Sequence, residues 1–259
     1  MERMTHSSGP SLSVRGAAAF AAALAMAGGH GPANAQQRQQ GAEPPPVQGL
    51  YATAPGAARY ATPDGAVRFV FDRSGGRAAL VRFEGDDEVH VLRPAMAAGG
   101  GELYRSEDGD VVLRVTPNGG VIVYTRANRS GAPASEEAQV APLTPEAVAF
   151  ARMQQRFRQL QALAERSVGQ AVTFTAPAQI SAPAVGLVLD AAERAAEGLA
   201  AAPLTTVRRV IIVIGPAPGV AMVGEQLTIQ VAPHMGYAGR PSSITIRNVV
   251  TGQVQGPAQ

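Results

Sequence analysis

The sequence predicts an α+β fold in which an N-terminal antiparallel β-meander packs with a C-terminal helix-strand-helix-strand layer. Turn signals recur about every ten residues between residues 57 and 125, and the runs between them are rich in β-branched and aromatic residues. After Thr144, apolar residues recur at helical spacing in two segments, with short strand-like runs between and after them. We therefore expect a meander of about seven strands at residues 48–126, a linker at 127–143 and an α+β region at 144–251.

The alternation of residues within the meander indicates which face is the core. In the runs 67–72, 79–84 and 111–116 every odd-numbered residue is apolar, as expected when successive side chains point to opposite faces. The even-numbered face is mixed, and its apolar members are Val70, Leu80, Leu92, Val112 and Ile122. A meander this small, with no disulfide or metal to staple it, is marginally stable alone. We therefore expect the later helices to cover that face.

The C-terminal half begins with a helix signal. Thr144 followed by Pro145 is typical of an N-cap and the first helical residue, and an apolar stripe from Phe150 to Ala164 continues the pattern to Arg166. A second amphipathic helix is predicted over 182–201. Further strands are predicted at 172–176, 207–214, 226–231 and 244–249, with a loop at 232–243 and a disordered tail at 252–259.

The N-terminus has the pattern of a secretory signal peptide at residues 1–35. Arginines precede an apolar run at 16–28, and Ala33-Asn34-Ala35 supplies small residues before a predicted cleavage ahead of Gln36. At a rise of about 1.5 Å per residue this run is shorter than a bilayer core of about 30 Å. Residues 36–47, rich in Gln and Pro, are expected to be a disordered leader. We expect an exported, periplasmic or secreted protein with no integral membrane span after cleavage.

Composition excludes several chemistries. All 22 basic residues are arginine, so lysine-dependent catalysis is excluded, and the absence of cysteine excludes disulfides and thiol nucleophiles. The formal net charge is only +2. The even-numbered face of the meander mixes arginines with acids, which favours cross-strand ion pairs over a basic patch and so over nucleic acid binding. The residues concerned are Arg68, Arg82, Arg114, Asp72, Glu84, Glu88 and Asp110.

Two acidic clusters, at residues 84–88 and 107–110, fall on predicted turns. Such oxygens could hold Ca²⁺, but neither cluster matches a calcium loop, and Asp and Gly also serve turn geometry themselves. We expect solvated turns there, no metal site and no cofactor. His90 is expected to contact Glu88 or a neighbouring acid. No nucleophile motif occurs, so no catalytic residue is assigned.

The loop at residues 233–243 is the most site-like segment of the sequence. It places His234, Tyr237 and Arg240 among glycines, which let a ligand approach the backbone. We predict these three residues as ligand-binding. The alternative is a structured connection in which Tyr237 and Arg240 pack locally.

Three segments resemble a known family. They are residues 69–75 (Phe-Val-Phe-Asp-Arg-Ser-Gly), Leu103-Tyr104-Arg105 leading to residues 112–116, and residues 236–243 (Gly-Tyr-Ala-Gly-Arg-Pro-Ser-Ser). Together they resemble an exported alphaproteobacterial family catalogued as a domain of unknown function. The resemblance implies export and a shared architecture, and it implies no reaction. The function we expect is a non-catalytic envelope protein that binds or assembles with an unknown envelope component. A hydrolase of envelope polymers is the alternative.

Overall fold

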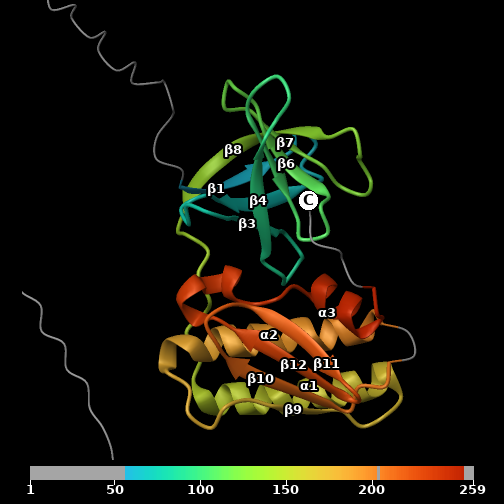
Figure 1. The fold of residues 1–259 in the computed structure, drawn as a ribbon. Helices are drawn as coiled ribbons and strands as arrows, with labels where there is room; N and C mark the ends of the chain where they lie inside the picture. Colours follow the sequence, from blue (N-terminus) through green and yellow to red (C-terminus); the bar gives the residue numbers. More distant parts are fainter. Residues whose placement is uncertain (1–55, 203–204, 254–259) are drawn as a thin grey trace, which may run out of the picture. The chain divides into compact units, whose positions relative to one another are not determined.

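Eight antiparallel strands form the first sheet of the computed structural model, which describes residues 56–202 and 205–253. The strands are β1 (Ala57–Ala61), β2 (Arg68–Asp72), β3 (Ala79–Phe83), β4 (His90–Met96), β5 (Glu102–Arg105), β6 (Val111–Val115), β7 (Val121–Val123) and β8 (Ala132–Val140). Each pairs with the next, and β1 also pairs with β8 (Figure 1). The predicted antiparallel meander is thus confirmed, but it closes into a barrel.

Strand β8 corrects the predicted linker at 127–143. Its residues are mostly small or charged, and only the partly buried Ala132 and Ala134 pack against the barrel core. The strand nevertheless pairs along its length with β1 and β7. Without β8, β1 and β7 would be bare sheet edges. Pairing with these two edges therefore holds β8 in the sheet, although its hydrophobic pattern is weak.

The barrel interior confirms the predicted core face. Phe69, Phe71, Val81, Leu113 and Val115 are all buried. Leu92 was expected on the mixed face, but it is 0% exposed in the interior, because β4 follows an irregular connection that shifts its alternation. The other four apolar residues of that face are partly buried.

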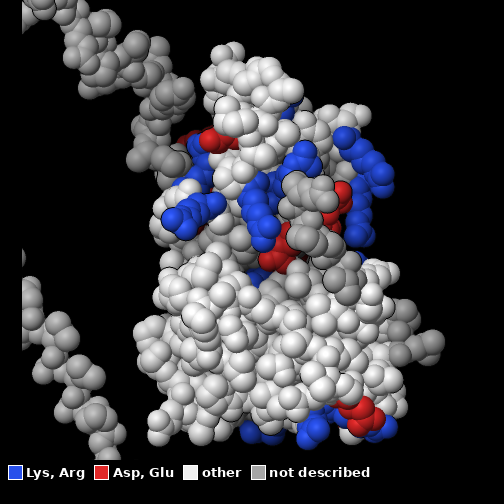
Figure 2. Space-filling view, in the orientation of Figure 1, with Lys and Arg blue, Asp and Glu red and all other residues white. Residues whose placement is uncertain are grey.

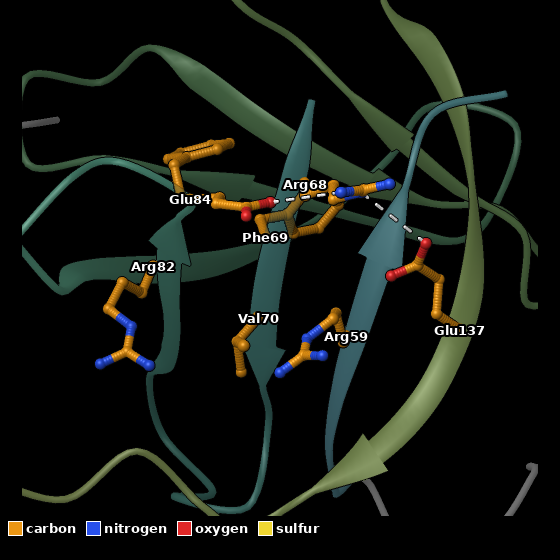
Figure 3. Close-up of a pocket in the computed structure, with 8 residues that line it drawn as sticks. Arg59, Arg68, Phe69, Val70, Arg82, Glu84 and Glu137 are labelled. Atoms are coloured by element: carbon orange, nitrogen blue, oxygen red, sulfur yellow. Dashed lines mark ion pairs between the residues drawn. The ribbon is translucent and has the colours of Figure 1, made fainter. Parts of the chain in front are cut away.

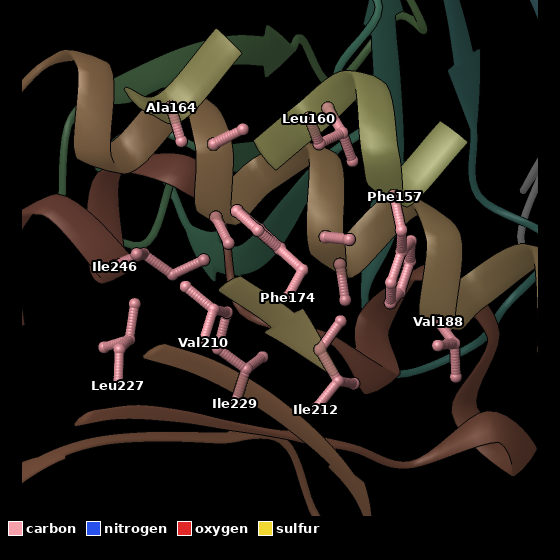
Figure 4. Packing of buried hydrophobic residues seen from close by; sticks show 14 of the residues in the cluster. Phe157, Leu160, Ala164, Phe174, Val188, Val210, Ile212, Leu227, Ile229 and Ile246 are labelled. Atoms are coloured by element: carbon pink, nitrogen blue, oxygen red, sulfur yellow. The ribbon is translucent and has the colours of Figure 1, made fainter. Parts of the chain in front are cut away.

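The second sheet has four strands in the order β11-β12-β10-β9. Strand β10 (Arg209–Ile214) runs parallel to both β9 (Thr173–Thr175) and β12 (Gln226–Val231), while β11 (Gly219–Val223) and β12 form an antiparallel hairpin. Helices α1 (Phe150–Val168) and α2 (Ala182–Ala200) pack on this sheet, and we call these elements together with α3 the α/β layer. Figure 4 shows the core between them, where Phe157 and Leu160 of α1 face Val210 and Ile212 of β10.

Two predictions for this layer are wrong. Helix α1 begins at Phe150 rather than Pro145, and no side chain caps it. The segment before it approaches α2 so closely that a Cβ on Gly186 would lie 1.8 Å from the carbonyl oxygen of Glu146. Glu146, which the sequence assigned to the first turn of α1, therefore lies outside that helix and packs against α2.

The second error concerns residues 244–249, which were predicted to form a strand. They lie instead in α3 (Ser243–Val250), where the Ser242 side chain caps the helix by accepting a hydrogen bond from the Thr245 amide. The predicted loop before it contains a 3₁₀ segment, η1 (Pro233–Gly239), broken by a non-helical Gly236.

All described residues belong to one compact unit that spans Gly49–Gln259. The predicted signal peptide, its cleavage site and the leader at 36–47 lie outside the described residues, as do residues 254–259 of the predicted tail. Among the helices that are described, none has both the length and the apolar character needed to cross a membrane.

Candidate functional site

Three turns at one end of the barrel, together with α3, line a cavity of about 870 Å³ that we call the groove. The turns are those that follow β3, β5 and β7. They share an end because alternate connections of an up-and-down meander fall on the same side. Apolar side chains make up much of the lining: Phe83, Leu103, Val111, Val112, Tyr124 and Ile244. A largely apolar concavity of this volume with a few polar groups is typical of a ligand site.

An imidazole and a carboxylate form the first polar feature of the groove. His90 Nε2 lies 2.9 Å from Asp86 Oδ2, which confirms the expected contact of His90 with a neighbouring acid, and the His90 ring lies 6.2 Å from that of Phe83. Burial raises the pKa of Asp86, but hydrogen bonds from His90 and from the Glu88 amide outweigh it and hold the pKa below its ordinary value. Asp86 is therefore a carboxylate at neutral pH.

The turn between β5 and β6 is tied down by its own groups. The Ser106 hydroxyl donates to the Asp108 carboxylate and lies 3.1 Å from the carbonyl oxygen of Asp110. Arg105 Nη1 donates to the carbonyl of Gly109 at 2.8 Å. These bonds fix the rim of the groove, as expected for Asp and Ser residues in turns.

Charges of both signs surround the apolar lining. Three acids, Asp86, Asp108 and Asp110, and two exposed arginines, Arg126 and Arg129, reach the groove. The groove can therefore hold an apolar ligand body while hydrogen-bonding polar groups at its rim. Among the residues that the structure describes, no three His, Asp or Glu side chains gather as metal ligands would.

The two acidic clusters also hold α3 against the barrel. Glu88 accepts from the Ser243 hydroxyl at 2.5 Å and from its amide at 3.2 Å. Glu107 accepts from the hydroxyls of Ser242 and Thr245, both at 2.5 Å. Since these residues form the first turn of α3, the bonds place the neighbouring Ile244 in the groove. The first cluster thus lines the groove with Asp86 and anchors α3 with Glu88, and the second lines it with Asp108 and Asp110 and anchors α3 with Glu107.

A buried ionic network lies next to this anchor. Arg240 and Arg194 are each 1% exposed. Arg240 pairs with Asp190, lies 3.4 Å from Glu88 and donates to the carbonyl of Val89 at 2.9 Å. Arg194 lies 2.8 Å from Glu197 and 3.7 Å from Glu88. Glu88 is therefore shared by two buried guanidinium groups, and this pairing offsets the cost of burying them.

The three residues predicted to bind a ligand are not placed alike. Arg240 is buried in the network, and its guanidinium lies 5.7 Å from the ring of the partly buried Tyr237. His234 is exposed. None of the three lines the groove. Their role in ligand binding stays a prediction, and the contacts seen here are those of the alternative, in which Tyr237 and Arg240 pack locally.

Sequence reasoning missed most of the groove residues. One signal was available, because the acidic clusters lie on the turns after β3 and β5, which a meander must bring to the same end. Nothing in the sequence indicated that Arg129 or Ile244 would join them, since Arg129 was assigned to a linker and Ile244 to a strand.

Comparison with known proteins gives one match. A family model described as "Domain of unknown function (DUF4908)" matches residues 46–250 of the chain. The comparisons with curated proteins and with solved structures gave no match. The expected resemblance to a family of unknown function is confirmed at this level, while the exported and alphaproteobacterial character of that family stays a prediction.

Proposed function

Because the chain belongs to the family described as "Domain of unknown function (DUF4908)", its activity must be argued from the site, and we propose that it is an exported, non-catalytic binding protein of the cell envelope. It works in the periplasm and holds an envelope component in the groove. The observation that carries the proposal is the groove itself, about 870 Å³ in volume and lined by six apolar side chains with charges at its rim. Export rests on the signal-peptide pattern of residues 1–35.

The contacts of the polar groups favour binding over hydrolysis. A serine hydrolase needs a base within hydrogen-bond reach of its nucleophile. In the described groove, the Ser106 hydroxyl is bonded to Asp108 and Asp110, while His90 is bonded to Asp86. These bonds order the rim of a binding surface, and no observation favours the alternative of a hydrolase of envelope polymers.

Export is tested by expressing the full chain with a C-terminal tag in a Gram-negative host. We expect a processed form that begins at Gln36 and is recovered with the periplasmic fraction. A variant with Ala33→Arg and Ala35→Arg should accumulate unprocessed, because signal peptidase reads small residues at these positions. Recovery of the unprocessed parent chain in the cytoplasm would contradict export.

Binding in the groove is tested by site-specific photo-crosslinking in the same cells. A photoreactive residue at position 126, on the groove rim, should give a discrete adduct, whereas the same residue at Val223, which is 76% exposed on β11, should not. Adding Ile244→Glu should abolish the adduct at position 126, because a charge then enters the apolar lining. Equal adducts from both positions, or an adduct that is unaffected by Ile244→Glu, would rule out the groove as the binding site.

A further inference from the structure

A second cavity, of about 370 Å³, lies on the outer face of the barrel over β1, β2, β3 and β8. Three arginines and two glutamates line it, so the charged lining sums to one positive charge; they are Arg59, Arg68, Arg82, Glu84 and Glu137. This is the reverse of the groove rim, where acids outnumber arginines.

The glutamates of this cavity are both engaged by a single arginine. Arg68 lies 4.0 Å from Glu84 and 3.9 Å from Glu137. Figure 3 shows the two pairs on either side of the Arg68 guanidinium. Within residues 56–202 and 205–253, neither Arg59 nor Arg82 forms an ion pair or a side-chain hydrogen bond. The cross-strand ion pairs expected from the sequence therefore leave two arginines of this face unmatched.

The strand register sets the spacing of these two arginines. Val70 is the direct neighbour of Arg59 on one side and of Arg82 on the other. Neighbouring strands lie about 4.8 Å apart, so the Cα atoms of the two arginines are separated by roughly 10 Å. In Figure 3 their guanidinium groups lie on either side of the Val70 side chain. Because the barrel is closed, hydrogen bonds on both sides of each strand fix this spacing.

We propose that Arg59 and Arg82 form a site for a phosphoryl group, which binds over Val70 between the two guanidinium groups. A guanidinium binds oxyanions through two parallel N–H donors. A carboxylate has two oxygens and presents one such edge, whereas a tetrahedral phosphoryl group presents several and can accept both arginines at once. The ligand class is therefore a phosphate ester or a pyrophosphate, which could be a soluble metabolite or the headgroup of a lipid. The site is separate from the proposed role of the groove and can fail independently of it.

The test measures binding of two probes to the full-length chain by calorimetry and by vesicle flotation. The probes are inorganic pyrophosphate in solution and vesicles that contain phosphatidylglycerol, with phosphatidylcholine vesicles as the reference. Binding of pyrophosphate would assign a soluble ligand, and binding of the anionic vesicles alone would assign a lipid headgroup. Either result supports the site, and binding of neither probe would overturn it.

Substitutions separate the site from general surface charge. The double variant Arg59→Gln/Arg82→Gln should weaken binding about tenfold or more, because two charge-assisted contacts are lost. Arg59→Lys/Arg82→Lys should also weaken it, since an ammonium keeps the charge but lacks the planar pair of donors. Arg93→Gln removes an exposed arginine on β4 outside the cavity and should leave binding unchanged. An equal loss in Arg93→Gln, or full binding by the glutamine pair, would overturn the proposal.

Discussion

The barrel and the α/β layer have separate apolar cores that differ in composition. The contact between the two regions is instead made largely by charged and hydroxyl groups. Aromatic pairs dominate the barrel interior: the rings of Tyr60 and Phe69 are stacked at 5.5 Å, and those of Phe71 and Tyr104 meet edge-on at 4.9 Å. The layer is built largely from aliphatic side chains and alanine. The contact that joins them runs through Glu88 and charged or hydroxyl groups of the layer.

This difference suggests a division of labour within one unit. Apolar burial stabilises each region from within, because that term scales with the apolar area removed from water. Buried ion pairs add little net stability, since desolvation costs about as much as pairing gains. A buried charge that loses its partner is strongly destabilising, however, so such pairs favour one arrangement of the groups that form them. We infer that the network around Glu88 fixes where α3 meets the barrel, and therefore the shape of the groove.

The largest effect should come from truncating the chain before β8. A chain that ends at residue 126 lacks the strand that pairs with both β1 and β7, so the interior opens and two edges are bare. We expect it to aggregate or to remain unfolded in circular dichroism and gel filtration. A chain that ends at residue 146 keeps β8 and the bond from the Leu143 amide to Asp72 at 2.7 Å, and it should fold.

The pair of truncations also decides between two accounts of the barrel. The sequence suggested that helices must cover the outer apolar residues, whereas the structure gives the barrel a closed interior of its own. If the chain ending at residue 146 is as unstable as the shorter one, the helices are required and barrel closure is not sufficient. If both chains fold, β8 is dispensable.

A smaller effect is expected from breaking the contact between the two regions. Arg240→Ala removes one of the two buried guanidinium groups that pair with both Glu88 and Asp190, and only Arg194 remains beside these acids. Removing one partner of a buried pair costs about 3–5 kcal/mol. Urea denaturation should show this loss in the free energy of unfolding. Amide exchange should rise first in the first turn of α3, which Glu88 anchors.

The matched control for this variant is Arg209→Ala. Arg209 is exposed on β10, so its removal should change the free energy of unfolding by less than about 0.5 kcal/mol. A cost for Arg240→Ala as small as that of the control would show that the buried network does not hold the two regions together.

The elements that sequence reasoning recovered are those whose local pattern and tertiary role agree. The turn spacing and the alternation of Phe69, Phe71 and Val81 predicted the hairpins and the core face, because both depend on neighbours in the sequence. Helix α2 and strands β9, β10 and β12 were also predicted from local pattern: helical spacing for α2, alternation for β9, a short continuous apolar run for β10 and a short strand-like run for β12.

The missed elements depend on distant partners. Strand β8 has only small apolar residues on its inner face, and its pairing with β1 joins segments some eighty residues apart. In α3, Ile244, Thr245 and Ile246 favour a strand locally. A cap at Ser242 and carboxylates from two barrel turns hold them in a helix instead. The part of the groove formed by the turns after β3 and β5 could be inferred, because a meander brings these turns to one end. The position of Ile244 could not, because it depends on the contacts of Glu88 and Glu107 with the first turn of α3.

The smallest expected effect is a pH dependence of the free energy of unfolding that comes from Glu197, a member of the buried network between the barrel and the α/β layer. Burial raises the pKa of Glu197 to about 7, although the Arg194 guanidinium opposes this; the charges of Glu88, Asp86 and Asp190 raise it further. The folded chain therefore holds this proton more tightly than the unfolded chain, in which the pKa has its ordinary value of 4.5.

The sign of the effect follows from that difference. The contribution of Glu197 to stability is fully present below pH 4.5 and is lost as the pH rises through about 7. Glu197→Gln cannot ionise, so it should be more stable than the parent at pH 8 and equal to it near pH 4 in urea denaturation. The difference should be small, because 46% of the side chain is exposed and water screens its charge. Glu165→Gln, on the exposed face of α1, is the control and should not reproduce the pattern. If the Glu197→Gln variant is instead less stable than the parent at pH 8, the ion pair with Arg194 outweighs desolvation, and the network stabilises the contact as well as fixing its geometry.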